Sequence, residues 1–104
     1  MSVPTVTWLD LSFGVYDGIP GTAWNDVPGI YIFARLDADG WRAVYIGETN
    51  SLANRLPGHE RGLEALLAGA THVHARVERD EPTRVARQDR LIETFQPELN
   101  DQGR

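Results

Sequence analysis

Residues 29–47 read GIYIFARLDADGWRAVYIG. Two runs rich in aromatic and β-branched residues flank the short polar segment DADG at positions 37–40. Such runs favour β-strands, and a glycine-containing segment between them is typical of a hairpin turn. The stretch therefore predicts a β-hairpin.

The length of the turn decides which side chains meet across this hairpin. If residues 38–40 form a three-residue loop with Gly40 in the left-handed conformation, Tyr31 lies opposite Gly47. Tyr31 and Tyr45 are then diagonal neighbours on one face, and Gly47 leaves space beside the Tyr31 ring. A two- or four-residue loop would put the two tyrosines on opposite faces. We choose the three-residue loop because glycine stands where that turn requires it.

The chain after the hairpin predicts two short helices and a third strand. Asn50 and Ser51 are suitable residues to begin a helix, which the pair at 57–58, proline and glycine, interrupts. A second helix is expected from residue 59 or 60 to 68, and the alternating pattern of residues 71–77 predicts a strand. We expect the second helix to bury its leucines, Leu63, Leu66 and Leu67.

The strongest helix signal begins at Glu81 and Pro82, with proline in the first turn, and ends before Pro97. Gln88 interrupts the inward stripe of this helix, because it lies three residues before the first of two adjacent apolar residues. The expected apolar stripe consists of Val85, Leu91, Ile92 and Phe95. The expected solvent- or anion-facing flank consists of Arg84, Arg87 and Arg90.

These elements predict one α/β (α+β) domain of residues 28–104, with a small, mostly antiparallel three-stranded sheet flanked by helices. Residues 1–27 contain prolines, glycines and aromatic residues without a lasting period. We expect them to form an irregular N-terminal extension that packs on the sheet and includes one short strand near residues 6–9.

Composition limits the class of protein. A chain of 104 residues fits one domain, and 41% apolar residues can make a core at that length. The absence of cysteine excludes disulfides, thiolate metal sites and a cysteine nucleophile. No apolar run is long enough for a membrane span and the first residues lack signal-peptide features, so we expect a cytoplasmic protein without membrane association.

The charge balance argues against a strong non-specific nucleic-acid binder. The formal net charge is -5, and all ten basic residues are arginine. Non-specific binding to nucleic acid depends on neutralising phosphates with cationic surface. The first forty residues carry five of the acids and only Arg35 as a base, so most of the excess lies outside the hairpin and the helices that follow it.

The sequence resembles the GIY-YIG nuclease family. The resemblance rests on Gly29-Ile30-Tyr31 and Tyr45-Ile46-Gly47 on successive predicted strands, on Arg55 followed four residues later by His59, and on a last helix that carries Leu91-Ile92 and is followed by Pro97 and Asn100. These motifs run in the family order from about residue 28 to 100.

The resemblance implies hydrolysis of DNA phosphodiester bonds with one divalent metal ion, Mg²⁺ or Mn²⁺. It implies that Tyr31 is the general base or water-orienting group, that Tyr45 helps to hold water and phosphate, and that His59 is a second donor or proton carrier. Arg55 would contact phosphate, and its positive charge would favour the phenolate of Tyr31, whose ordinary pKa is near 10. Gly29, Gly47 and Asn100 would be structural.

One position departs from the family pattern. The family has a metal-binding glutamate three residues before the Leu-Ile pair, where this chain has Gln88. A neutral amide is a weak ligand for a hard cation, so metal binding and cleavage are expected to be impaired. Two alternatives therefore stay open: a catalytically inactive nucleic-acid-binding module, and a domain that interacts with another protein or with itself.

Overall fold

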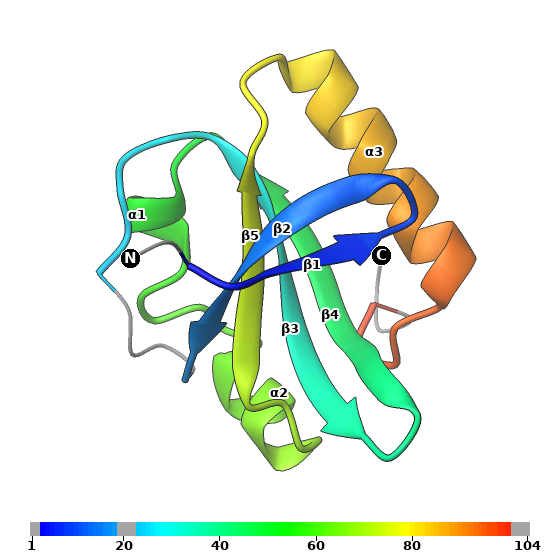
Figure 1. Cartoon of the computed structure of the whole chain (residues 1–104). Helices are drawn as coiled ribbons and strands as arrows, with labels where there is room; N and C mark the ends of the chain where they lie inside the picture. Colours follow the sequence, from blue (N-terminus) through cyan, green and yellow to red (C-terminus); the bar gives the residue numbers. More distant parts are fainter. Residues whose placement is uncertain (1–2, 19–22, 101–104) are drawn as a thin grey trace.

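The computed structural model of the chain describes residues 3–18 and 23–100. They form a five-stranded antiparallel sheet in the order β1-β2-β5-β3-β4, with three helices (Figure 1). The sheet curls into a half-barrel. The strands are β1 (Thr5–Trp8), β2 (Leu11–Asp17), β3 (Gly29–Asp37), β4 (Gly40–Thr49) and β5 (His72–Val77). The helices are α1 (Leu52–Arg55), α2 (Gly62–Leu67) and α3 (Glu81–Phe95).

The expectation of a three-stranded sheet with an irregular N-terminal extension is wrong. β1 and β2 form a hairpin, and β2 pairs with β5 to extend the sheet by two strands. The hairpin turns between Trp8 and Leu11, and Leu9 takes a positive φ of 59° there. That conformation normally selects glycine, asparagine or aspartate, so a leucine at this position gives no turn signal in the sequence.

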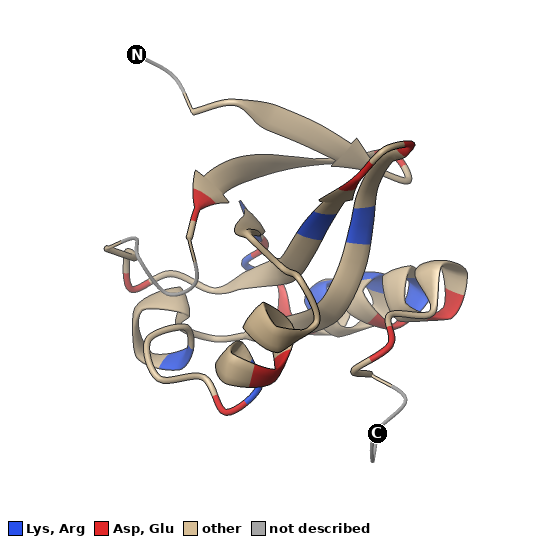
Figure 2. Ribbon diagram, turned by 90° about the horizontal axis from the view of Figure 1, so that it is seen from below, with Lys and Arg blue, Asp and Glu red and all other residues tan. Residues whose placement is uncertain are grey.

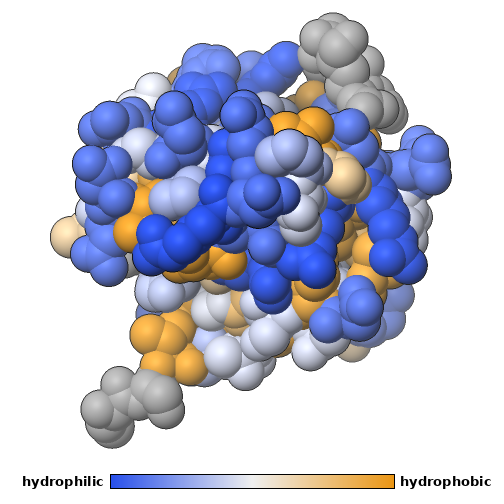
Figure 3. Space-filling model, turned by 90° about the horizontal axis from the view of Figure 1, so that it is seen from above, coloured by the Kyte–Doolittle hydropathy of each residue, from blue (hydrophilic) through white to orange (hydrophobic). Residues whose placement is uncertain are grey.

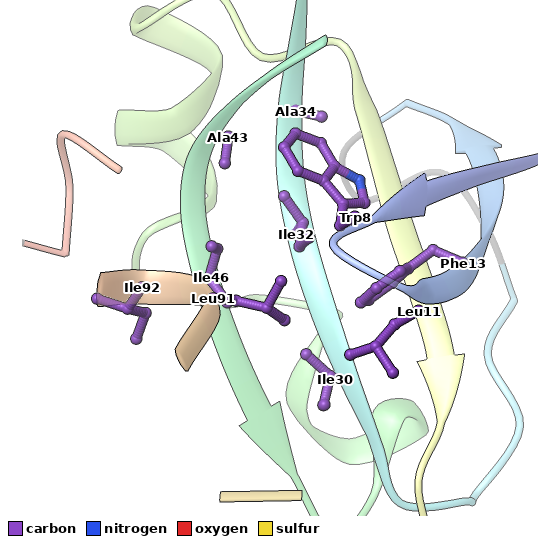
Figure 4. Close-up of a cluster of buried hydrophobic side chains, with 10 residues drawn as sticks. All are labelled: Trp8, Leu11, Phe13, Ile30, Ile32, Ala34, Ala43, Ile46, Leu91 and Ile92. Atoms are coloured by element: carbon purple, nitrogen blue, oxygen red, sulfur yellow. The ribbon is translucent and has the colours of Figure 1, made fainter. Parts of the chain in front are cut away.

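One face of the sheet carries an apolar core that α3 and the β1–β2 hairpin cover together (Figure 4). Alternate residues of β3 point into it, and Leu91 and Ile92 of α3 pack against them, as their positions in the stripe predicted. The buried members are Trp8, Leu11, Phe13, Ile30, Ile32, Ala34, Ala43, Ile46, Leu91 and Ile92.

The opposite face carries a second core, which α1 and α2 cover. Its buried members are Tyr31, Phe33, Val44, Leu52, Leu56, Ala65, Ala70, Val73 and Ala75. Because β3 alternates between the two faces, Tyr31 and Phe33 belong to this core while Ile30 and Ile32 belong to the other.

The helices begin and end where polar and glycine residues dictate. Ser51 caps α1, since its hydroxyl accepts a hydrogen bond from the Asn54 N–H, and the Asp80 carboxylate accepts one from the Thr83 N–H at the start of α3. Gly69 ends the α2 segment with a φ of 95°.

The expected inward face of α2 is wrong. Leu63, Leu66 and Leu67 are exposed, and the buried residue of this helix is Ala65. α2 has six residues, and a helix of fewer than two turns offers too few positions for spacing alone to define the buried side.

The surface is polar and of mixed charge. Basic and acidic residues are interspersed along the ribbon (Figure 2), and the end of the molecule in Figure 3 is mainly hydrophilic with small separate hydrophobic areas. Within the described ranges, no helix is long and apolar enough to cross a membrane.

Candidate active site

Tyr31 and Tyr45 lie on one face of the β3–β4 hairpin, as the sequence predicted. Tyr31 pairs with Gly47 across the strands, and the two tyrosine rings are 6.3 Å apart between centroids. The Tyr31 ring lies directly over Gly47: a Cβ atom there would collide with the Tyr31 hydroxyl and ring. Because Gly47 has no side chain, the Tyr31 ring can lie against β4 at this point.

The predicted register is found from Gly29 to Phe33, but the predicted turn and the pairing next to it are wrong. Asp37 pairs with Gly40, so the loop has two residues rather than three. A β-bulge between Phe33 and Ala34 then inserts Val44 as an extra residue, and both Val44 and Tyr45 contact the same core. The inserted residue reverses the alternation that a two-residue loop alone would produce, which brings Tyr45 back to the face of Tyr31.

His59 joins this cluster from a turn rather than from a helix. α1 ends at Arg55, and the chain passes through Gly58, which has a φ of 70°, before His59. The Nε2 atom of His59 lies 2.7 Å from the Tyr31 hydroxyl, and the imidazole is buried. The turn therefore places the imidazole on the tyrosines without the regular i, i+4 helical geometry that proline prevents.

The hydrogen bonds of His59 fix which nitrogen carries its proton. The backbone N–H of Arg61 donates to His59 Nδ1 at 2.9 Å, so that nitrogen carries no hydrogen. Burial, followed by the charge of Arg55, lowers the pKa of His59 to about 4, so the ring is neutral at pH 7. The single ring proton is then on Nε2, which donates to the Tyr31 hydroxyl oxygen.

Arg55 is bound to a carboxylate, which the sequence did not predict. Its two terminal nitrogens donate to the two carboxylate oxygens of Glu60 at 2.6 and 2.7 Å. Burial, followed by the nearby Tyr45, raises the pKa of Tyr31, while the charge of Arg55 and a hydrogen bond from it act in the opposite direction. Arg55 thus acts on the pKa of Tyr31 in the expected direction, but burial outweighs it and the net shift of the pKa is upward.

Two further motif residues hold the hairpin in place. A Cβ on Gly29 would approach the Arg76 carbonyl oxygen to 2.5 Å, so glycine permits the close contact of β3 with β5. The buried Asn100 side chain accepts a hydrogen bond from the Ile46 N–H and donates one to the Ile46 carbonyl, each at 2.8 Å. The two Asn100 hydrogen bonds act on β4, the strand that carries Tyr45, whereas Gly29 acts on β3, the strand that carries Tyr31.

Gln88 does not join the tyrosine cluster through any contact that the structure records. Its side-chain nitrogen donates to the carboxylate of the adjacent Asp89 at 2.9 Å. In the part of the chain that the structure describes, no three histidine, cysteine or acidic side chains gather where a metal ion would fit. A neutral amide committed to a neighbouring carboxylate does not fit a tightly held divalent cation.

The flank of α3 differs from the expected solvent- or anion-facing row of arginines. Arg84 is buried, donates to the Glu48 carboxylate at 2.7 Å and also donates to the Glu78 carbonyl. Arg87 donates to the Glu78 carboxylate at 2.6 Å. Sequence reasoning missed Glu48 and Glu60 as partners. Glu60 had a local signal, since it directly follows His59, whereas Glu48 is 36 residues from Arg84 in the chain.

Comparison with known proteins agrees with this architecture. No protein-family model and no curated protein matches the chain. Among solved structures, the chain is similar to the GIY-YIG N-terminal endonuclease domain of UvrC from Thermotoga maritima, a point mutant bound to its catalytic divalent cation. The TM-score is 0.58 at 25% sequence identity, over 71% of this chain and 82% of that one. The chain therefore has the GIY-YIG endonuclease fold, and its resemblance to that family is confirmed.

Proposed function

We propose that this domain binds DNA and hydrolyses its phosphodiester bonds slowly, at a site that we call the tyrosine face: Tyr31, Tyr45, Arg55 and His59. The observation that carries the proposal is the contact of the Tyr31 hydroxyl with the neutral His59 ring. Phosphodiester hydrolysis requires a deprotonated water and donors to the pentacoordinate phosphate. The tyrosine face supplies candidates for both.

The protons of the Tyr31–His59 pair support a role in orienting water. Because His59 Nε2 donates to the Tyr31 oxygen, the hydroxyl hydrogen of Tyr31 is directed to another acceptor. A hydrogen bond to the oxygen also favours the phenolate form and opposes the effect of burial. The Tyr31 hydroxyl can therefore donate to a water and orient it, and Tyr45 lies beside Tyr31 at the less buried side.

Phosphate recognition falls to Arg55. A guanidinium presents parallel N–H groups that match two phosphate oxygens, as they match the two oxygens of Glu60 here. The neutral Gln88 does not supply the charge that a bound cation needs, and for this reason we propose slow cleavage.

A plasmid-nicking assay with Mg²⁺ or Mn²⁺ tests the proposal. Gln88→Glu restores a carboxylate at the family position and should increase cleavage by at least about tenfold. Adding Tyr31→Phe to this variant should lower its cleavage rate about 10²-fold or more, as expected for loss of a proton-transfer group. Gln96→Glu makes the same charge change at an exposed position just past α3 and is the matched control.

Two results contradict the proposal. Cleavage that is equal in the Gln88→Glu and Gln96→Glu variants would remove the role of position 88. If adding Tyr31→Phe leaves the cleavage rate unchanged, Tyr31 has no part in the reaction.

The second candidate is a DNA-binding module that does not cleave, and the hydrogen bond from Gln88 to Asp89 favours it. It predicts no cleavage by the parent chain or by Gln88→Glu, together with DNA binding that weakens with salt and with Arg55→Ala.

A further inference from the structure

The Arg55 guanidinium holds an anion that belongs to the chain itself. Its NH1 and NH2 atoms bind the two Glu60 oxygens at 2.6 and 2.7 Å, a bidentate arrangement. Two oxygens of a phosphate would bind the same two donors in the same way. The carboxylate therefore stands where a phosphate would have to bind.

We propose that Glu60 is an intramolecular competitor for the phosphate-binding guanidinium of Arg55, so that a phosphate group binds only by displacing this carboxylate. The inference rests on the proposed function, because that function assigns phosphate contact to Arg55. It adds a residue that limits substrate binding at the tyrosine face.

The position of Glu60 allows displacement. Its side chain is 67% exposed, and it lies in the turn between α1 and α2, after Gly58. An ion pair between exposed groups is worth little, because water and salt screen it, so a phosphate with more charge can replace it. The side chain can then turn into solvent without opening the core.

Protonation does not release Arg55 near neutral pH. Hydrogen bonds from Arg55 are the main cause that lowers the pKa of Glu60 to about 2. Glu60 thus stays negatively charged over the whole range in which the protein would work, and displacement depends on the competing anion.

A different role for Glu60 makes the opposite prediction. If Glu60 instead holds Arg55 in the orientation that phosphate needs, its removal weakens anion binding. If Glu60 competes, its removal strengthens anion binding. This gain should disappear when Arg55 is also removed.

Binding to two probes distinguishes these roles. The first probe is inorganic phosphate, followed by the NMR signals of the Arg55 side chain, and the second is a labelled DNA duplex in EDTA, followed by fluorescence anisotropy. Glu60→Gln should tighten phosphate and DNA binding by about two- to fivefold.

Glu64→Gln is the matched control. Glu64 is a second exposed glutamate of the same segment, and it pairs with Arg61 at 3.0 Å. The same charge is removed, so a purely long-range effect would appear in both variants. The double variant Arg55→Ala with Glu60→Gln should bind DNA no more tightly than Arg55→Ala alone.

The proposal is overturned if Glu60→Gln binds phosphate no more tightly than the parent chain or Glu64→Gln, or if the gain in DNA affinity persists without Arg55. Failure of the proposed function looks different. If no variant binds DNA but Glu60→Gln tightens phosphate binding through Arg55, the competitor role stands and DNA is the wrong substrate.

Discussion

Two arginine–glutamate pairs of almost equal length lie on opposite sides of the sheet, and burial separates them. Arg55 and Glu60 are 2.6 Å apart, with 34% and 67% of their side chains exposed. Arg84 and Glu48 are 2.7 Å apart, with 4% and 26% exposed. The first pair lies at the tyrosine face, and the second joins α3 to β4.

The difference shows that the effect of an arginine–glutamate pair on stability depends on how far the pair is buried from solvent. Arg84 also donates to the Glu78 carbonyl, so its loss would take a hydrogen-bond donor from both the Glu48 carboxylate and that carbonyl. Removing one member of a buried pair is costly, because the other charge remains desolvated. An exposed pair contributes little to stability and is free to change partners.

The largest effect is expected from Arg84→Met. It leaves the Glu48 carboxylate unpaired and should lower the free energy of unfolding by about 3 kcal/mol in urea denaturation. Arg87→Met is the control, since Arg87 also pairs with a glutamate at 2.6 Å but is 41% exposed, and it should cost less than about 1 kcal/mol. Similar losses in the two variants would show that burial does not separate these pairs.

Gly47→Ala should disturb the tyrosine face by a steric effect rather than a charge effect. The new methyl group meets the Tyr31 ring and hydroxyl, so we expect a loss of about 2 kcal/mol on unfolding, as for other overpacked positions. Gly62→Ala, at the start of α2, should be neutral or stabilising because alanine favours helix. An unchanged stability of Gly47→Ala would mean that Tyr31 does not need this space.

Each face of the sheet also buries one histidine, and acid should act on both. Burial is the main cause that lowers the pKa of His59 and of His74 to about 4, below their ordinary value of 6.5. The unfolded chain then binds more protons than the folded chain between these values. Stability should therefore fall as the pH drops from about 6.5 towards 4, by about 1.4 kcal/mol per pH unit for each histidine.

Urea denaturation at pH 7, 6 and 5 measures this slope. His59→Gln and His74→Gln should each remove about half of it, since the variants lack one titrating group. A slope that neither substitution reduces would assign acid sensitivity to other groups.

The smallest effect on stability is expected from Arg55→Met. The Arg55–Glu60 pair is exposed, so the free energy of unfolding should change by less than about 1 kcal/mol. Denaturation beside the Arg84→Met variant provides the direct comparison. A loss as large as that of Arg84→Met would mean that the Arg55–Glu60 pair is a structural link and not a replaceable contact.

The sequence predicted the tyrosine pair because local patterns specify it. Strand alternation, the glycine of the turn and Gly47 all lie within one hairpin, and the structure brings Tyr31 and Tyr45 to one face. The predicted loop was one residue too long, and the extra residue Val44 in the bulge restored the pairing of Tyr31 and Tyr45 on one face. A bulge has no reliable sequence signal, because it depends on how the strand packs on both sides.

Long-range charge pairing could not be predicted in the same way. Arg84 was expected on a solvated flank, since helical spacing gives only its angle around α3 and not what lies opposite. Its partner Glu48 belongs to another element, and the β1–β2 hairpin that completes the core on this side lacks a turn signal. The position of His59 relative to Arg55 depends on the turn that follows α1, where the spacing rules for helices do not apply.

The C-terminal segment has a consequence for solubility. β4 is an edge strand of the sheet, and an open edge can pair with a strand of another molecule. The Asn100 side chain occupies the N–H and C=O of Ile46, and the Leu99 N–H binds the Val44 carbonyl at 3.1 Å. The chain thus covers its own edge over this part of β4, and the same contacts that steady the strand of Tyr45 also block intermolecular strand addition and aggregation there.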